Sequence, residues 1–306
     1  MNPPDIQPDG RVIKTCKGPD PDTRAPQQRP PVGACDTHCH VFGPTDRYPY
    51  APGRAYSPPD APLAGLQRVH RILGIDRAVI VQASPHGSDN TAMLDAIATR
   101  PADYRGIAIV DGHETDADYA ALHAGGIRGV RFNFVQHLGG MHDLALFDRT
   151  VDRLAEIGWH VVMHMGAEDI LTHRARLEAL RIPFVIDHMG RVRADAGSEQ
   201  APFQVLLALL RDERAWIKIC GPERVSTAGA PFHDATPFAR ALYDAAPART
   251  LWGTDWPHPN IAGDMPNDGE LVDLLHRALP DPVARQAVLV DNPTRLYWPE
   301  RVGGTA

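Results

Sequence analysis

The stretch ACDTHCHVFGP, near the N-terminus, brings together the side chains most used in acid–base and metal chemistry. Alternate residues of a strand face opposite sides, so Asp36, His38 and His40 are expected to share one face. Imidazoles in that arrangement can bind a metal, polarise a carbonyl group or be hydrogen-bonded structural residues. Cys35 and Cys39 would lie on the other face, where we expect small buried thiols rather than ligands.

Three further apolar segments end in a histidine or an aspartate. HVVMHMG has His164 near its end, PFVIDHM has His188 and TLWGTDW has Asp255. If these segments are parallel strands of one barrel, their side chains reach the same rim as His38 and His40. Such a set suits one divalent cation, zinc or manganese. The candidate metal ligands are His38, His40, His164 and Asp255. The set equally suits metal-free catalysis, in which imidazoles polarise a carbonyl and the aspartate takes a proton from water.

The elements that must position these groups alternate between β-branched apolar runs and helix-like stretches. The expected strands are residues 34–42, 77–84, 104–111, 127–134, 160–166, 183–189, 215–221 and 250–256. The expected helices are residues 63–74, 90–100, 118–126, 146–158, 171–181, 203–213, 237–246 and 269–280. Eight even units predict an α/β fold, a single-domain (β/α)8 TIM barrel over residues 32–306. The competing layout is a doubly wound open sheet, but no Gly-rich dinucleotide fingerprint follows an early strand.

Composition narrows the class of protein and its partners. The chain has 306 residues, of which 43% are hydrophobic and 23% charged, with a net charge of -7. These values are typical of a soluble globular protein without a basic surface for nucleic acid, and no apolar run approaches the ~20 residues that span a membrane. Residues 1–31 are rich in Pro, Asp and Arg and lack the order of a signal peptide. We therefore expect a flexible N-terminal arm, a cytoplasmic location and a small-molecule partner, with the oligomeric state left open.

An arginine directed into the barrel predicts an anionic ligand. In GVRFNF, Arg131 alternates with apolar residues that can face the helices, so its guanidinium can bind a carboxylate or sulfonate inside the barrel. Arg224, just beyond the seventh strand, is either a second clamp or an exposed loop charge. Lys218 interrupts an apolar strand, and we expect its ammonium group to reach water. The Pro- and Tyr-rich loop 43–61 is expected to lie over the mouth of the barrel.

The motifs DTHCH, VRFNF, DHMGR and WGTDWPH, each on its own expected strand, resemble those of the amidohydrolase superfamily. Within it, the chain is similar to the branch of 2-pyrone-4,6-dicarboxylate lactonases and sulfomuconolactone hydrolases, from about Ala34 to the DNPTRLYW stretch. This resemblance implies that Asp255 is the general base. It also implies that His38, His40 and His188 surround the scissile carbonyl of a lactone.

The resemblance further implies that Tyr56 and Ser84 contact the substrate. The chain departs from the dicarboxylate lactonases at two places. Where those enzymes are expected to have another arginine after VRFNF, this chain reads VQHLGG, which makes His137 the candidate substrate contact. His164 stands where the dicarboxylate lactonases carry a tyrosine and metal-dependent members carry a ligand. Sulfomuconolactone hydrolases are associated with zinc and dicarboxylate lactonases with metal-free catalysis, so both alternatives stay open.

The expected function is hydrolysis of an anionic lactone, carboxylated or sulfonated, during the breakdown of aromatic compounds. A water molecule activated by Asp255 would attack the carbonyl, which makes the protein a hydrolase of carboxylic ester bonds. The alternative is a metal-dependent decarboxylase of an aromatic or muconate-type acid, because the same strand ends can hold a metal and a substrate carboxylate. A third possibility is a non-catalytic protein that binds an anion or a metal.

Overall fold

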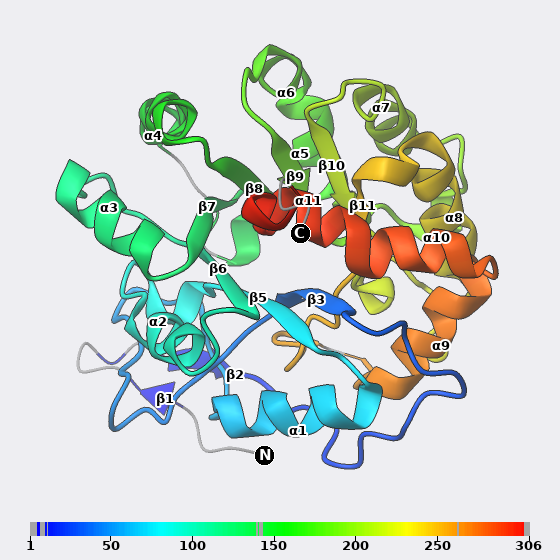
Figure 1. The fold of residues 1–306 in the computed structure, drawn as a ribbon, viewed down its shortest axis with the longest axis horizontal. Coiled ribbons are helices and arrows are strands. Elements are labelled where there is room, and N and C mark those ends of the chain that lie inside the picture. Colours follow the sequence, from blue (N-terminus) through cyan, green and yellow to red (C-terminus); the bar gives the residue numbers. More distant parts are fainter. Residues whose placement is uncertain are drawn as a thin grey trace.

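The computed structural model describes residues 5–6, 10, 12–138, 140, 143–261 and 263–302. Eight parallel strands form one sheet in the order β11-β10-β9-β8-β7-β6-β5-β3, so each strand pairs with the next one along the chain. Helices follow the strands and surround the sheet (Figure 1). This arrangement confirms the expected (β/α)8 barrel. None of the helices in the described ranges is long and apolar enough to cross a membrane.

The barrel strands lie within the segments expected from the sequence and end earlier than expected. They are β3 Cys35–Cys39, β5 Arg77–Val81, β6 Tyr104–Ala108, β7 Ile127–Asn133, β8 His160–His164, β9 Phe184–Ile186, β10 Ala215–Lys218 and β11 Thr250–Leu251. The helices that follow are α1 Leu63–Leu73, α2 Thr91–Ala98, α3 Asp116–Ala124, α4 Leu144–Ile157, α5 Ala167–Thr172, α6 Arg174–Ala179, α7 Ala201–Leu209, α8 Thr236–Ala245 and α9 Asp268–Ala278. The expected helix over residues 171–181 is interrupted, because α5 ends and α6 begins on either side of His173.

The first and last strands of the barrel are joined by backbone hydrogen bonds outside a regular ladder. The amide of Asp255 donates to the carbonyl of His38 at 2.7 Å, and the amide of His40 donates to the carbonyl of Trp256 at 2.8 Å. The φ angle of Asp255 is 66°, in the left-handed region, so the chain is no longer extended there. The last strand ends at Leu251, and the segment after it, as far as Trp256, still closes the barrel.

A buried carboxylate reinforces the junction between the first strand and the segment after the last one, here called the seam. Asp36 accepts hydrogen bonds from the hydroxyl of Thr254 at 2.6 Å, from the amide of His38 at 3.0 Å and from Nε2 of His70 at 3.0 Å. The pairing of β3 with β5 shifts its register between Asp36 and Cys39. Such an irregularity interrupts the alternation of side chains along a strand. The expectation that Asp36 shares a face with the two histidines is therefore wrong: its side chain contacts His70 of α1.

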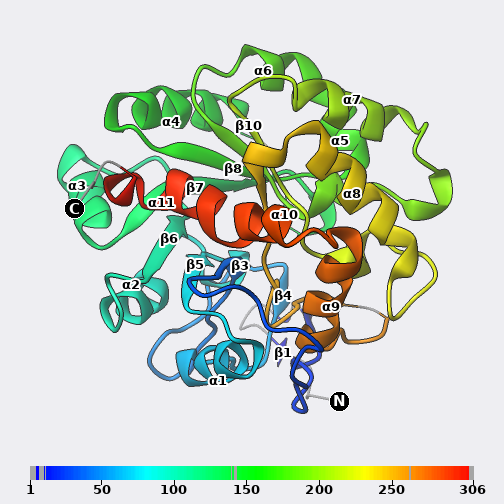
Figure 2. The same cartoon turned by 45° about the vertical axis from the view of Figure 1, so that its right-hand side comes forward.

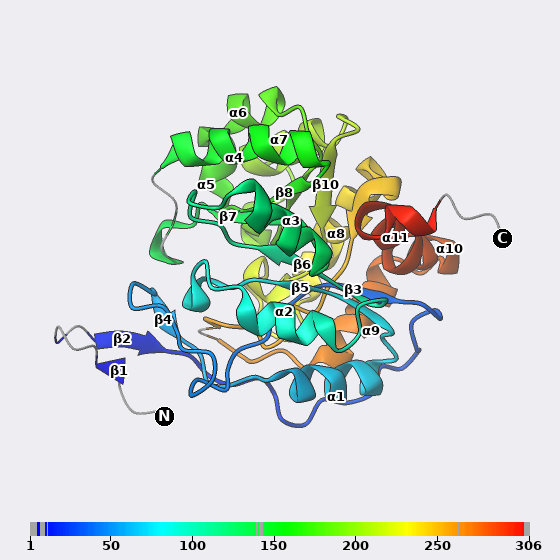
Figure 3. The same cartoon turned by 60° about the vertical axis from the view of Figure 1, so that its left-hand side comes forward.

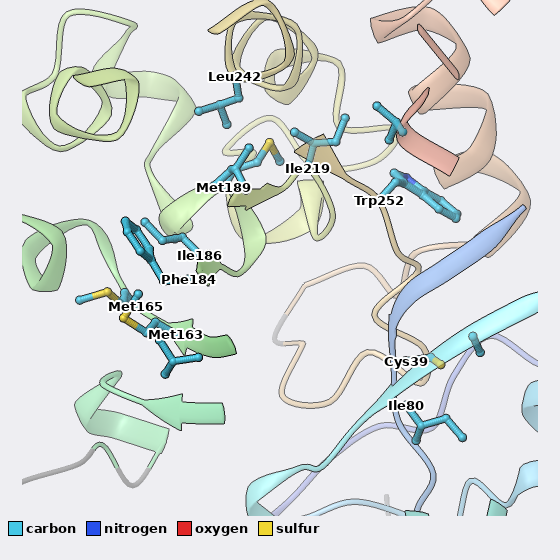
Figure 4. Packing of buried hydrophobic residues seen from close by; sticks show 14 of the residues in the cluster. Cys39, Ile80, Met163, Met165, Phe184, Ile186, Met189, Ile219, Leu242 and Trp252 are labelled. Carbon is cyan, nitrogen blue, oxygen red and sulfur yellow. The ribbon is translucent and has the colours of Figure 1, made fainter. Parts of the chain in front are cut away.

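The two larger clusters of apolar side chains lie one on each side of the sheet. The inner cluster consists of Cys35, Val79, Val81, Ile107, Val162, Val185, Trp216, Leu251, Tyr297 and Trp298. Figure 4 shows part of the outer cluster, in which Met189 and Ile219, both just beyond the ends of strands, lie near Leu242 of α8. Alternate strand residues belong to the two clusters, as Val79 and Ile80 do, which is the pattern of a sheet buried on both faces.

The two ends of the barrel are covered by different parts of the chain. Helices α10 (Pro282–Gln286) and α11 (Asn292–Tyr297) lie across one end (Figures 1 and 2). The strands β1 (Asp5–Ile6), β2 (Val12–Thr15) and β4 (Tyr56–Ser57) lie at the other end (Figure 3). Because residues from α11 belong to the inner cluster, this helix closes the apolar end, and the opposite end is left for the polar strand termini.

Part of the segment expected to be a flexible arm contacts the loops at the polar end. Strand β2 pairs with β4 of the long first loop, and the amide of Cys16 donates to the carbonyl of Ser57 at 3.0 Å. The thiol of Cys16 also donates to Oδ1 of Asn260, beyond the eighth strand, at 3.3 Å. These contacts place residues 12–16 over the mouth of the barrel; the flexibility of residues 1–31 and the boundary at residue 32 stay predictions.

We expect Thr254→Val to destabilise the protein by about 1–3 kcal/mol, because it removes a hydrogen bond to a buried carboxylate and leaves that acceptor partly unsatisfied. Urea unfolding followed by circular dichroism measures the change. Thr227→Val, at an exposed position, is the matched control and should change the free energy of unfolding by less than about 0.5 kcal/mol. Equal stabilities of the two variants would show that the seam does not depend on Asp36.

Candidate active site

A buried carboxylate and three imidazoles meet at the polar end of the barrel. Oδ1 of Asp255 lies 3.3 Å from Nε2 of His40 and 3.6 Å from Nε2 of His38. Nε2 of His188 is 3.9 Å from the same oxygen. The four groups come from the ends of the first, sixth and eighth barrel strands, as expected from the sequence.

The backbone that carries His188 and Asp255 is strained. Of the seven non-glycine residues with positive φ in the described ranges, six lie in the segments 188–191 and 255–260. His188 has a φ of 52° and Asp255 a φ of 66°, in a region that costs roughly 1–3 kcal/mol for most residues. Strain of this kind persists only where surrounding contacts impose it. Its concentration at two strand ends supports a functional role for this rim.

Arg224 is paired with the carboxylate of Asp255. Its Nε and Nη2 donate to Oδ2 of Asp255 at 3.1 and 2.7 Å, and Nη2 also donates to the carbonyl of Pro259 at 2.9 Å. Burial by itself would raise the pKa of Asp255, but Arg224 and the imidazoles hold it well below its usual range. The group is therefore a carboxylate at neutral pH. Arg224 is a buried partner of this group and not the exposed loop charge considered above.

A second buried carboxylate, which the sequence did not single out, lies behind the first. Oδ2 of Asp187 accepts a hydrogen bond from Nε of Arg131 at 2.9 Å, and its Oδ1 lies 3.1 Å from Nζ of Lys218. Lys218 is completely buried, so the expectation that its ammonium group reaches water is wrong. Burial raises the pKa of Asp187, but Lys218, His38 and Arg131 more than compensate and hold it well below its usual range. For Asp187 and Lys218 alike, the sequence signal of a buried ion pair was a single charged residue within an apolar segment.

The polar groups open into a small pocket that contains most of the predicted site residues. Its lining consists of His40, Tyr56, Ser84, Arg131, Leu138, His164, His188, Arg224, Asp255, Pro259 and Asn260. His38 is not in the lining and lies behind it, with its ring centre 4.5 Å from that of His188. His137 is exposed and outside the lining, because the turn Gln136–Leu138 directs Leu138 inward instead. Leu138, Pro259 and Asn260 also line the pocket and were not predicted from the sequence, because they lie in loops outside the motifs.

The donor set of His38, His40 and Asp255 fits a divalent cation. One ligand atom from each of the three lies within 4.8 Å of the others. Nδ1 of His40 is 2.8 Å from the carbonyl of Val81, to which it can only donate. Nε2 of a neutral His40 ring is then an acceptor that faces a carboxylate oxygen at 3.3 Å. A proton or a metal ion between these two atoms would remove the repulsion.

His164, the fourth candidate ligand, has a different environment. Nη1 of Arg191 lies 3.5 Å from Nε2 of His164 and can donate to it. Burial and the neighbouring arginines lower the pKa of His164 well below its usual value. Among the described residues it belongs to none of the groups whose geometry suits a metal. A cation held by the other three candidates would therefore not include His164.

Comparison with known proteins identifies the family. The sequence model of the amidohydrolase family matches residues 35–298. The chain belongs to the amidohydrolase family. It is 43% identical over 286 residues to a 2-pyrone-4,6-dicarboxylate hydrolase of Comamonas testosteroni, covering 90% of this chain and 94% of that protein. It is 40% identical over 290 residues to a 4-sulfomuconolactone hydrolase of Rhizobium radiobacter, covering 93% and 96%.

A solved structure agrees with this assignment. It is described as a probable 2-pyrone-4,6-dicarboxylic acid hydrolase from Acinetobacter baumannii with citric acid bound. The two chains are 26% identical and superimpose with a TM-score of 0.76, covering 87% of this amidohydrolase and all of the other chain.

We expect His40→Asn to weaken zinc binding about tenfold or more, because it removes a ligand next to Asp255, whereas His164→Asn should leave the affinity unchanged. Isothermal titration calorimetry of the chelator-treated protein with zinc chloride measures both. The two variants make the same substitution in the same pocket and differ only in the proposed ligation. Equal losses of zinc affinity in the two variants would show that His164 is also a ligand. If the unaltered protein bound no zinc, the proposed metal site would be contradicted.

Proposed function

We propose that this amidohydrolase hydrolyses an anionic lactone formed in the breakdown of aromatic compounds. The observation that carries the proposal is the carboxylate of Asp255 within 3.9 Å of three imidazoles, in a pocket that also contains two arginines. The relatives support the substrate class, because a pyrone dicarboxylate and a sulfomuconolactone are both cyclic esters that carry an anion. The reaction is acyl transfer to water.

Asp255 is proposed to take a proton from the attacking water. Its low pKa keeps it ionised, and its position beside the imidazoles places the water next to the lactone carbonyl. The water oxygen bonds to the carbonyl carbon, and N–H groups of His38 and His188 stabilise the developing oxyanion. His40, whose Nδ1 donates to Val81, joins them when a proton also lies on its Nε2. When the ring C–O bond breaks, the proton held by Asp255 passes to the leaving oxygen. The new carboxylic acid then loses its own proton to solvent, so the products are a carboxylate, an enol or alcohol, and one proton.

The two buried arginines are proposed to hold the substrate's anionic group. Asp187 fixes Nε of Arg131 at 2.9 Å, which orients the guanidinium plane before substrate arrives. Arg224 lines the same pocket, next to Asp255. A planar guanidinium suits the paired oxygens of a carboxylate or a sulfonate equally well. The hydroxyls of Tyr56 and Ser84 line the pocket beside them, and His137 stays an untested candidate for a substrate contact at the rim.

A divalent metal, zinc or manganese, is compatible with this site. His38, His40 and Asp255 would hold it, and when bound it would supply a Lewis acid that polarises the lactone carbonyl. Without it, the imidazoles themselves must donate to the carbonyl oxygen. The roles proposed for Asp255 and for the arginines are the same in both cases.

A panel of lactones tests the proposal. We expect rapid proton release from 2-pyrone-4,6-dicarboxylate or 4-sulfomuconolactone and little from an uncharged lactone of similar size, because only the anions can pair with Arg131 and Arg224. A pH indicator assay, run with added zinc and again after chelator treatment, measures hydrolysis and its metal dependence. Failure to open any anionic lactone would contradict the proposal. Carbon dioxide release from an aromatic or muconate-type acid, without ring opening, would support the decarboxylase alternative.

We expect Asp255→Asn to lower kcat by about 10²- to 10⁴-fold, because an amide cannot accept the proton from water. Substrate binding, measured by equilibrium titration, should persist because both arginines remain. Asp264→Asn, at an exposed position further along the same loop, is the matched control and should retain full activity. An Asp255→Asn variant with undiminished turnover would exclude this carboxylate as the base.

A further inference from the structure

Three groups that can share protons meet behind the pocket-lining histidines. Nζ of Lys218 lies 3.0 Å from Nδ1 of His38 and 3.1 Å from Oδ1 of Asp187. Nδ1 of His38 and Oδ1 of Asp187 are 3.2 Å apart. The side chains of all three residues are completely buried, so water cannot take part in these contacts. No role described above requires Lys218.

The contact between Lys218 and His38 limits where a proton of the His38 ring can lie. A neutral imidazole carries one N–H, and its other nitrogen is an acceptor. The neighbours of Nδ1 therefore decide whether the single proton lies on Nδ1 or on Nε2, the nitrogen that faces Asp255.

The contact with Lys218 favours Nδ1 as the acceptor. An ammonium group can only donate, so a proton on Nδ1 would place two donors 3.0 Å apart. The pair Lys218–His38 satisfies hydrogen-bond geometry, whereas Oδ1 of Asp187 has no partner that does so among the described residues. Asp187 thus attracts the ammonium group by charge and holds it against the ring.

We propose that Lys218 is a positioning residue that donates a hydrogen bond to Nδ1 of His38 and so places the single ring proton on Nε2. That nitrogen lies 3.6 Å from Oδ1 of Asp255 and has no hydrogen-bond partner among the described residues. Its N–H is therefore a free donor directed toward the catalytic carboxylate. If the proposed function holds, this donor serves the lactone oxyanion; the placement of the proton does not depend on that function.

Nitrogen-15 spectra of histidine-labelled, metal-free protein without substrate test the placement directly. The signals of His38 are those lost in the His38→Asn variant. We expect Nδ1 of His38 to have the shift of an unprotonated, pyridine-type nitrogen in the unaltered protein. A protonated, pyrrole-type Nδ1 there would overturn the proposal, and this measurement requires no change at Lys218.

Lys218→Met and Lys218→Gln then separate the hydrogen bond from the charge. Both substitutions keep an unbranched chain and remove the charge, but only glutamine retains an N–H donor. We expect the proton to move to Nδ1 in Lys218→Met, because Asp187 becomes its remaining neighbour, and to stay on Nε2 in Lys218→Gln. Identical His38 spectra in the two variants would overturn the proposal, because a role in packing or charge alone affects both alike.

Kinetics provide a second readout that depends on the proposed function. Lys218→Met should lower kcat for an anionic lactone about tenfold or more and change KM little, because the lost donor acts on the oxyanion. Lys218→Gln should retain a larger fraction of kcat. If the His38 spectra of the two variants differed but their kcat values were equal, the proton on Nε2 would not contribute to catalysis. The proposed placement of the proton would still hold. A protein without any lactonase activity would fail only the proposed function.

Discussion

The hydrogen bond from the amide of Asp255 to the carbonyl of His38, 2.7 Å long, joins the ends of the barrel sheet and sets the geometry of the site. Because it links the backbones of the two residues, their side chains cannot separate without opening the barrel. Asp36 reinforces this seam through hydrogen bonds to Thr254 and to the amide of His38. The distance between the proposed base and the imidazoles thus follows from closure of the fold, and the loops over the mouth can vary without changing it.

Charge compensation is the second constraint on this site. Asp255 and Asp187 are both buried and ionised, which is costly unless each has cationic partners. Arg224 compensates Asp255, and Lys218 with Arg131 compensates Asp187. Each arginine therefore has an internal partner before substrate binds. Under the proposed function, an anionic substrate would share these guanidinium groups with Asp255 and Asp187 and would bind through the N–H donors that remain.

The sequence predicted what depends on strand periodicity and missed what depends on long-range pairing. His38, His40, His188 and Asp255 could be placed at one rim because parallel strands of a barrel end on the same side. The face of Asp36 was predicted wrongly, since an irregularity in strand pairing leaves no mark in the order of residues.

The burial of Lys218 could not be predicted from the sequence for the same reason. An isolated lysine in an apolar strand normally extends to water, and its partner Asp187 is far from it in the sequence. His137 likewise matched a motif position, but the turn that carries it directs Leu138 into the pocket. Orientation of a loop residue depends on backbone angles that composition does not determine.

The proton on His38 connects these constraints to the choice between the two catalytic alternatives. A metal ion at Nε2 needs the lone pair of that nitrogen, so the proton would have to lie on Nδ1 and donate to Asp187. The hydrogen bond from Lys218 opposes that state and favours an imidazole that donates from Nε2. Under the proposed placement, a set of ligand residues is not sufficient for metal dependence. Lys218, buried on the seventh barrel strand, would bias His38 toward donating a hydrogen bond from Nε2.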